Sequence, residues 1–276
     1  MNKLLSAGFC RLTKSRVLWA FVILSVVFAL YIANTRYQEL TVYKSDPTLE
    51  RSLFNIINFI GILMAVFTSI FIGTDYADGT IRNKLIVGHT RTMVYLSNFI
   101  ISTVAGCIIA AVYILVTCII TIPMLGFATL PVSDLLMASV DCFFLILSFS
   151  SLLTMIAMIV SNKTTSAVTC ILLMFGLMFV STFLLNVLSQ PKTVTEMVAA
   201  GNGEQPIIRD VPNPGYVSGT KRDFYQFAVD FNPAGQALEL SMLHAPDLKI
   251  LSVYSGIVIV LTTSCGLYIF RRKDLK

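Results

Sequence analysis

The residues that could perform chemistry are few and widely separated in this sequence. The only two histidines, His89 and His244, lie far apart, and the six cysteines show no CxxC or CxxxC spacing. The sequence also lacks the HExxH, GxSxG and GxxxxGK[ST] motifs that mark zinc proteases, serine hydrolases and phosphate-binding loops. We therefore expect that this chain is not an enzyme and that it binds no cofactor or metal itself.

Five polar or polarisable residues inside apolar stretches are candidates for lining a path through the protein: Asn55, Asn58, Asp141, Met174 and Met178. A carboxylate within a membrane is costly and often functional, but Asp141 lies only seven residues into its apolar stretch, where water could reach it. The asparagines are spaced i, i+3 and could instead bond a neighbouring helix. The methionines equally suit core packing. Both interpretations stay open for each residue.

The composition determines the solvent in which these residues work. The chain is 56% hydrophobic, only 13% charged, and has a mean hydropathy of +0.80, whereas a soluble domain carries about 25% charged residues. Six apolar runs are long enough to cross the roughly 30 Å of hydrocarbon in a bilayer as helices. The sequence therefore predicts an all-α membrane protein, a single transmembrane domain over residues 1–276, with spans at 17–34, 53–73, 93–124, 135–161, 165–188 and 250–270.

The distribution of lysine and arginine predicts how these spans are oriented. Twelve of these residues lie in 1–16, 74–92, position 163 and 271–276, against three in the short connections on the opposite side. Because basic residues favour the cytoplasmic side, both termini are expected in the cytoplasm.

Two segments outside the spans are predicted to touch the membrane surface. In residues 1–16, Leu4, Leu5, Phe9 and Leu12 can share one helical face with basic residues opposite, which predicts an interfacial helix; a frayed basic tail is the alternative. Segment 189–249 lies outside the cell in this topology and holds six of the nine prolines. Its first part, including Asn202, Gly203, Pro206, Pro212 and Pro214, is expected to form turns.

The second part of segment 189–249 is apolar again but broken at Asn232-Pro233. Each piece is about ten residues long, which is too short to cross a bilayer. We therefore expect two short re-entrant or interfacial helices there.

The connection 74–92 is longer than two adjacent spans require. Asp78-Gly79-Thr80 is typical of a turn and cap, and it precedes a short predicted helix from Ile81 to Val87 that Gly88 ends. Ile81, Leu85 and Gly88 fall on one face, with Arg82 and Lys84 elsewhere. Such an amphipathic helix suits docking into a groove of another protein, whereas a solvated basic loop would serve only the orientation of the chain.

Residues 71–98 (FIGTDYADGTIRNKLIVGHTRTMVYLSN) resemble the corresponding loop of ABC-2-type transporter permeases. In that family a run similar to G-x-[ED]-[YF]-x-x-G-T-[IL]-R-N-K-L follows the second span and forms the coupling helix that contacts an ATPase. Asp75 occupies a position that is often Glu. The resemblance implies an ABC-2/ABCG-like type V exporter fold with ATPase-coupling residues Tyr76, Asp78, Gly79, Thr80, Ile81, Arg82, Asn83 and Lys84.

The resemblance also implies partners and a cargo. It implies an ABC ATPase subunit that binds ATP and Mg, a second permease protomer, lipid contact in a bacterial plasma membrane, and no nucleic acid. Similar permeases export phenol-soluble modulins and lantibiotics, so an amphipathic peptide of toxin or bacteriocin type is the expected cargo. Lipid, drug or sodium export by the same kind of permease, and a secondary transporter or channel without an ATPase, are the alternatives.

Overall fold

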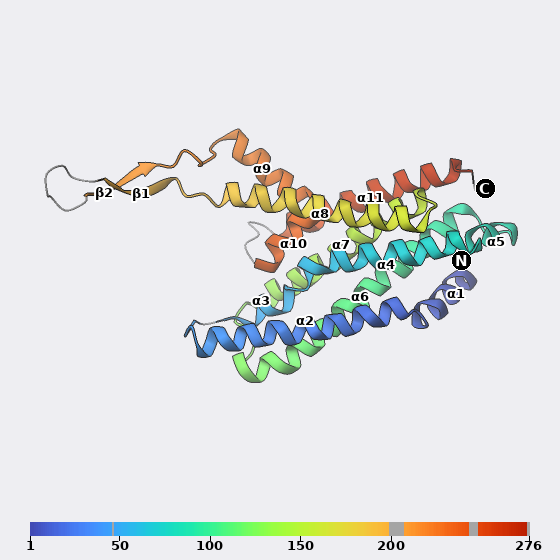
Figure 1. Ribbon diagram of the computed structural model, residues 1–276, viewed down its shortest axis with the longest axis horizontal. Coiled ribbons are helices and arrows are strands. Elements are labelled where there is room, and N and C mark those ends of the chain that lie inside the picture. Colours follow the sequence, from blue (N-terminus) through green and yellow to red (C-terminus); the bar gives the residue numbers. More distant parts are fainter. Residues whose placement is uncertain (46, 199–206, 243–247, 275–276) are drawn as a thin grey trace.

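The computed structural model describes residues 1–45, 47–198, 207–242 and 248–274. It is a bundle of long helices with residue 1 and the C-terminal helix ending on one side and a two-stranded hairpin projecting from the other (Figure 1). We call these the terminal end and the hairpin end. Asn202, Gly203, Pro206 and His244 lie outside the described residues.

Among the described residues, six helical segments are long and apolar enough to cross a membrane, which confirms the predicted number of spans and indicates a multi-pass membrane protein. These segments are α2 (Arg16–Thr41), α3 and α4 together (Leu49–Ala77), α6 (Arg91–Leu125), α7 (Val132–Ile159), α8 (Lys163–Leu188) and most of α11 (Leu248–Arg272).

The second span is two helices, α3 (Leu49–Phe54) and α4 (Ile57–Ala77). At the break, the Tyr113 hydroxyl donates to the Ser52 carbonyl at 2.8 Å. This bond reduces the cost of an interrupted helix ladder within a buried segment. The helix α4 ends four residues beyond the predicted limit at residue 73, so Asp75 and Tyr76 belong to its last turn.

The helices α4 and α7 form the centre of the bundle. In their most apolar windows 67% and 61% of the residues are buried, against 17% to 28% for the other spans. The buried apolar residues form two clusters, one around Ile60 and Phe149 and one around Phe71 and Phe270. The outward faces of α2, α6, α8 and α11 are apolar, as expected of helices that face lipid.

The segment after α8 contains a hairpin that sequence analysis did not predict. Strands β1 (Thr193–Val198) and β2 (Ile207–Pro212) pair antiparallel, with Thr193 opposite Pro212 and Val198 opposite Ile207. The β1 sequence TVTEMV is rich in β-branched residues, which favour strands. The prediction of turns was therefore incomplete, because the prolines at the end of β2 obscured this short pattern.

Two short helices follow, α9 (Thr220–Phe231) and α10 (Pro233–Met242), as predicted. The side-chain amide of Asn232 donates to the Leu177 carbonyl at 3.0 Å and to the Ser181 hydroxyl at 2.7 Å, both on α8. The break between α9 and α10 is therefore fixed by hydrogen bonds to a neighbouring span. Most of α10 is buried against α4, α7 and α8.

A carboxylate pair lies where α9 meets α10. The amide of Gln226 donates to Asp230 Oδ1 at 2.7 Å and to Glu239 Oε1 at 2.8 Å. Glu239 is only 4% exposed. Burial raises the pKa of Glu239 to about 7, an outcome that includes the lowering effect of the Gln226 hydrogen bond and the raising effect of Asp230. Protonation of Glu239 therefore changes near neutral pH.

We predict that Glu239 makes the stability of the protein pH-dependent. The pKa of Glu239 is higher in the folded protein than its ordinary value of 4.5. The folded state therefore holds more protons between pH 4.5 and 7, and the free energy of unfolding falls as pH rises through that window. Thermal unfolding in detergent should show a lower Tm at pH 8 than at pH 6, and Glu239→Gln should remove most of the difference.

The matched control is Glu196→Gln, which neutralises an exposed carboxylate on β1. That variant should keep the wild-type difference in Tm between pH 6 and pH 8. An undiminished pH dependence in Glu239→Gln would contradict the assignment.

Candidate functional site

One buried carboxylate joins three helices at the terminal end. Asp75, in the last turn of α4, is 2% exposed. Its Oδ1 accepts a hydrogen bond from Arg11 Nη1 of α1 (Asn2–Thr13), and its Oδ2 lies 2.9 Å from Lys84 Nζ of α5 (Thr80–Ile86). The ion pairs of Asp75 therefore connect the N-terminal helix, the second span and the short helix of the 74–92 connection.

The helix α1 presents Arg11 on its packed side. Leu4 and Leu12 are buried, and α1 comes so close to α6 that a Cβ on Gly8 would lie 2.1 Å from Ile101 Cδ1. Arg11 is seven residues from Leu4, two helical turns, so both lie on one face. The expected helix is present, but the expectation that its basic residues lie opposite the apolar face is wrong for Arg11. The reason is that Arg11 turns to the packed side of α1, where it forms an ion pair with the buried Asp75.

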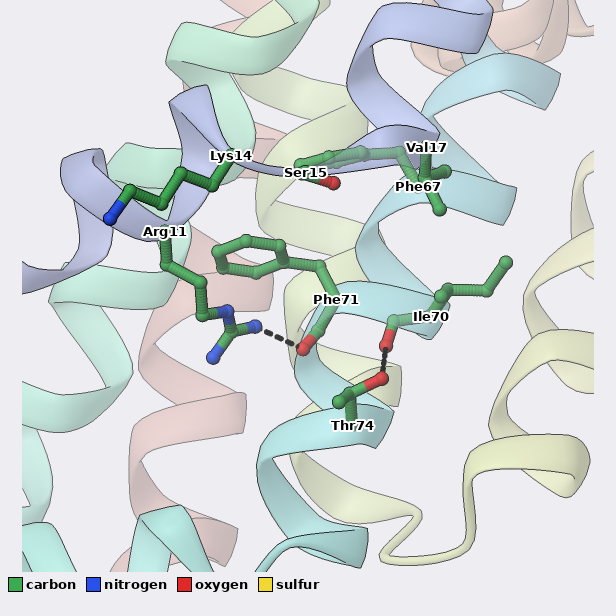
Figure 2. Close-up of a pocket in the computed structure, with 8 residues that line it drawn as sticks. All are labelled: Arg11, Lys14, Ser15, Val17, Phe67, Ile70, Phe71 and Thr74. Atoms are coloured by element: carbon green, nitrogen blue, oxygen red, sulfur yellow. Dashed lines mark hydrogen bonds between the residues drawn. The ribbon is translucent and has the colours of Figure 1, made fainter.

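The guanidinium of Arg11 also contacts Phe71. Its Cζ lies 3.6 Å from the centroid of the Phe71 ring, and Nη2 donates to the Phe71 carbonyl (Figure 2). Burial lowers the pKa of Arg11 to about 10. At neutral pH the side chain still carries its charge, so it remains a full partner for Asp75.

The helix α5 is positioned by a glycine and two inward side chains. Gly79 has φ +65°, the left-handed conformation that allows the chain to reverse between α4 and α5. Ile81 is buried in the cluster around Phe71, and Lys84 points to Asp75. Burial, together with repulsion from Arg11, lowers the pKa of Lys84 to about 8. Arg11, Lys84 and Asp75 therefore leave one net positive charge at neutral pH.

The opposite side of α5 is open. Arg82 and Asn83 are exposed, and Ile86 and Val87 expose 73% and 77% of their surfaces. Ile86 and Val87 are not among the coupling residues that the sequence predicts. The available signal was that both are apolar and end a helix whose buried side is already occupied by Ile81. Two exposed aliphatic residues beside an arginine are typical of a protein-binding surface.

The remaining predicted coupling residues are divided between the two sides. The Tyr76 hydroxyl donates to the Met158 carbonyl at 2.6 Å, so this ring faces the end of α7. Lys273 Nζ lies 4.6 Å from the Tyr76 ring centroid and donates to the Ile159 carbonyl at 2.7 Å. Asp78 is exposed and Thr80 is half-buried. Tyr76 therefore joins the end of α4 to the end of α7.

A second cation, missed by sequence analysis, holds the end of α11. Arg91 Nη1 donates to the carbonyls of Phe270 at 2.9 Å and Arg271 at 3.1 Å. Cations stabilise the C-terminal ends of helices because the last carbonyls lack partners in the helix. Arg91 and Lys273 together fix the ends of α7 and α11 beside α4.

Three of the predicted path residues meet at the other end of α4. Asn58, Met174 and Met178 line one cavity of about 10 Å³, which has room for one water at most. The amide of Asn58 donates to Asn55 Oδ1 at 3.4 Å across the break before α4. The side chains around this cavity are therefore closely packed.

Asp141 does not line that cavity. Its carboxylate accepts a hydrogen bond from the Ser252 hydroxyl of α11 and is 1% exposed. The expectation that water reaches Asp141 near the end of its span is wrong, because α11 covers it.

We predict that Asp75→Asn lowers the pKa of Lys84 below about 8, because the repulsion from Arg11 is then unopposed. The loss of the ion pairs should also weaken the docking of α1 and α5 by about 1–2 kcal/mol, less than for a fully buried pair because water screens both cations. The rate of Lys84 acylation as a function of pH, read by peptide mass spectrometry, measures the pKa.

The matched control is Asp78→Asn, which neutralises an exposed carboxylate three residues away. It should shift the Lys84 profile much less. Equal profiles for wild type and Asp75→Asn would show that Asp75 does not hold Lys84.

Comparison with protein-family models and with curated proteins gave no match to this chain.

Proposed function

We propose that this chain is the membrane subunit of an ATP-driven ABC exporter and that α5 docks onto a separate ATPase subunit. The observation that carries the proposal is the division of α5 into two sides. Ile81 and Lys84 anchor it to the bundle, while Arg82, Ile86 and Val87 are free to contact a partner. The resemblance of residues 71–98 to ABC-2-type permeases supports the same assignment.

The proposed orientation puts α5 and both termini in the cytoplasm of a bacterium, where ATP is available. The basic residues around α5 and at both ends of the chain support this orientation. ATP and Mg would be bound by the ATPase subunit. A short helix with an apolar end suits a groove on that subunit.

Through Asp75, the proposed contact between α5 and the ATPase would also move other helices. The ATPase would push on α5, and the ion pairs of Asp75 with Lys84 and Arg11 would pass the displacement to α4 and α1 together. Docking and transmission therefore belong to different residues of the same short helix. Substitutions can separate them.

We predict that Arg82→Glu and Ile86→Asp each weaken copurification with the ATPase encoded in the neighbouring reading frame by about tenfold or more, as at binding hot spots. The chain should still insert and keep its Tm, because both side chains are exposed. Arg272→Glu is the control, since it reverses an exposed charge at the same end but on α11. Unchanged copurification and ATP hydrolysis in all three variants would show that α5 only connects two spans and does not bind the ATPase.

We further propose that the cargo is an amphipathic peptide and that two copies of the chain form its path. The support is the near absence of charge in the spans, where the buried polar residues are mostly serine and threonine. In addition α8 exposes Phe175, Phe179 and Phe183 in a row at helical spacing, a surface that a second protomer could cover. Met174, a predicted path residue, is buried inside the protomer against α4.

We predict that an amphipathic cationic peptide stimulates ATP hydrolysis by the reconstituted complex several-fold, because it can partition into the membrane and reach the apolar path. A scrambled, non-amphipathic peptide of the same composition is the control and should be inert. The assay includes a lipophilic drug and a sodium gradient. Stimulation by sodium alone would refute the peptide assignment and indicate an ion path.

A further inference from the structure

A cavity of about 260 Å³ opens beside the turn that joins α1 to α2. The turn and the adjoining part of α4 form its walls, and Figure 2 shows the side chains around it. The lining residues are Arg11, Lys14, Ser15, Val17, Phe67, Ile70, Phe71 and Thr74.

The lining separates into a cationic part and an apolar part. Lys14 and Arg11 lie together on one side of the view in Figure 2, and Val17, Phe67 and Ile70 lie on the other. Charged and apolar groups on opposite sides of one cavity match a molecule with a charged head and an apolar chain.

The charges around the cavity favour an anion. Arg11 is paired with Asp75, but Asp75 is shared with Lys84, so the three groups leave one positive charge. Lys14 is exposed and adds a second. Among the residues that line the cavity there is no carboxylate. An incoming anion therefore meets Arg11 and Lys14 in the lining, while the carboxylates that act on Arg11, Asp75 and Asp78, lie outside it.

The cavity lies at the level where the chain enters the apolar part of the first span. Trp19 begins that span, is 55% exposed and donates from its indole nitrogen to the Thr13 carbonyl at 2.8 Å. Tryptophan concentrates at the boundary between lipid headgroups and hydrocarbon. A bilayer with its headgroup boundary at Trp19 would place phosphate groups near Lys14 and acyl chains near Val17.

We propose that this cavity binds an anionic phospholipid from the leaflet at the terminal end. Its phosphate contacts Arg11 and Lys14, and one acyl chain runs along Val17, Phe67 and Ile70. The bound phosphate balances the excess positive charge and holds α1 against α4 through the same guanidinium that binds Asp75. The site does not depend on the proposed transport function, because the chain alone forms it.

The experiment measures binding of short-chain phosphatidylglycerol to the purified full-length chain in neutral detergent, by native mass spectrometry. Short-chain phosphatidylcholine tests the need for net negative charge, and glycerol 3-phosphate tests the need for the acyl chain. The variants are Lys14→Glu, which reverses a cavity charge, and Ile70→Trp, which fills the apolar part. Lys3→Glu reverses an exposed charge on α1 that does not line the cavity.

We expect phosphatidylglycerol to bind at least about fivefold more tightly than phosphatidylcholine, since each basic residue near a lipid phosphate contributes about 1 kcal/mol. Lys14→Glu and Ile70→Trp should each weaken phosphatidylglycerol binding by about fivefold or more, while Lys3→Glu changes it less than about twofold.

Three results would overturn the proposal. Equal loss in Lys14→Glu and Lys3→Glu would show general attraction to a basic helix. Equal binding of both lipids would show a site indifferent to charge. Binding of glycerol 3-phosphate as tight as that of phosphatidylglycerol, unaffected by Ile70→Trp, would identify a site for a soluble phosphate instead.

Discussion

Removing a carboxylate from water costs several kcal/mol unless cations and hydrogen bonds replace the lost solvent. Asp75 meets this requirement at the end of an apolar helix, and the arrangement of the terminal end follows from how it does so. One cation comes from α1 and the other from α5, so two peripheral helices are held by a single group on the central helix. The cavity at the α1–α2 turn has its cationic side for the same reason, since Arg11 belongs to both.

The middle of the bundle is held differently. There several hydroxyl groups of serine and threonine donate to carbonyls of their own helix, as Ser69 does to Val66 and Thr121 to Thr117. These bonds satisfy the hydroxyls without joining one helix to another. Ion pairs and capping cations at the terminal end, and the Asn232 and Gln226 contacts at the hairpin end, supply polar links between elements. Between these ends the helices are held by apolar packing and by the hydrogen bond from the Thr262 hydroxyl of α11 to the Ser151 hydroxyl of α7 at 2.8 Å.

Local sequence signals predicted the elements better than the contacts between them. Hydropathy predicted six spans, the Asn232-Pro233 pair predicted the break between α9 and α10, and Gly79 predicted the start of α5, because each depends on neighbouring residues only. The direction of a side chain depends on distant residues. Arg11 and Asp75 are 64 positions apart, and nothing near either one in the sequence shows that they meet. For the same reason the sequence predicts Lys84 at a partner surface, although its side chain pairs with Asp75. On the open side of α5 the exposed residues include Ile86 and Val87.

The helix α4 carries Asp75 in its last turn and Asn58 in its first. Each residue of the helix rises about 1.5 Å, so these two residues, at positions 58 and 75, stand roughly 25 Å apart along one axis. An α-helix resists compression along that axis, because every turn is closed by hydrogen bonds. A shift of α4 by one ångström at the terminal end therefore arrives nearly undiminished at the closed cavity of Asn58, Met174 and Met178. The helix α4 therefore transmits displacement along its axis as a rigid body. The cavity at its other end has room for one water molecule at most.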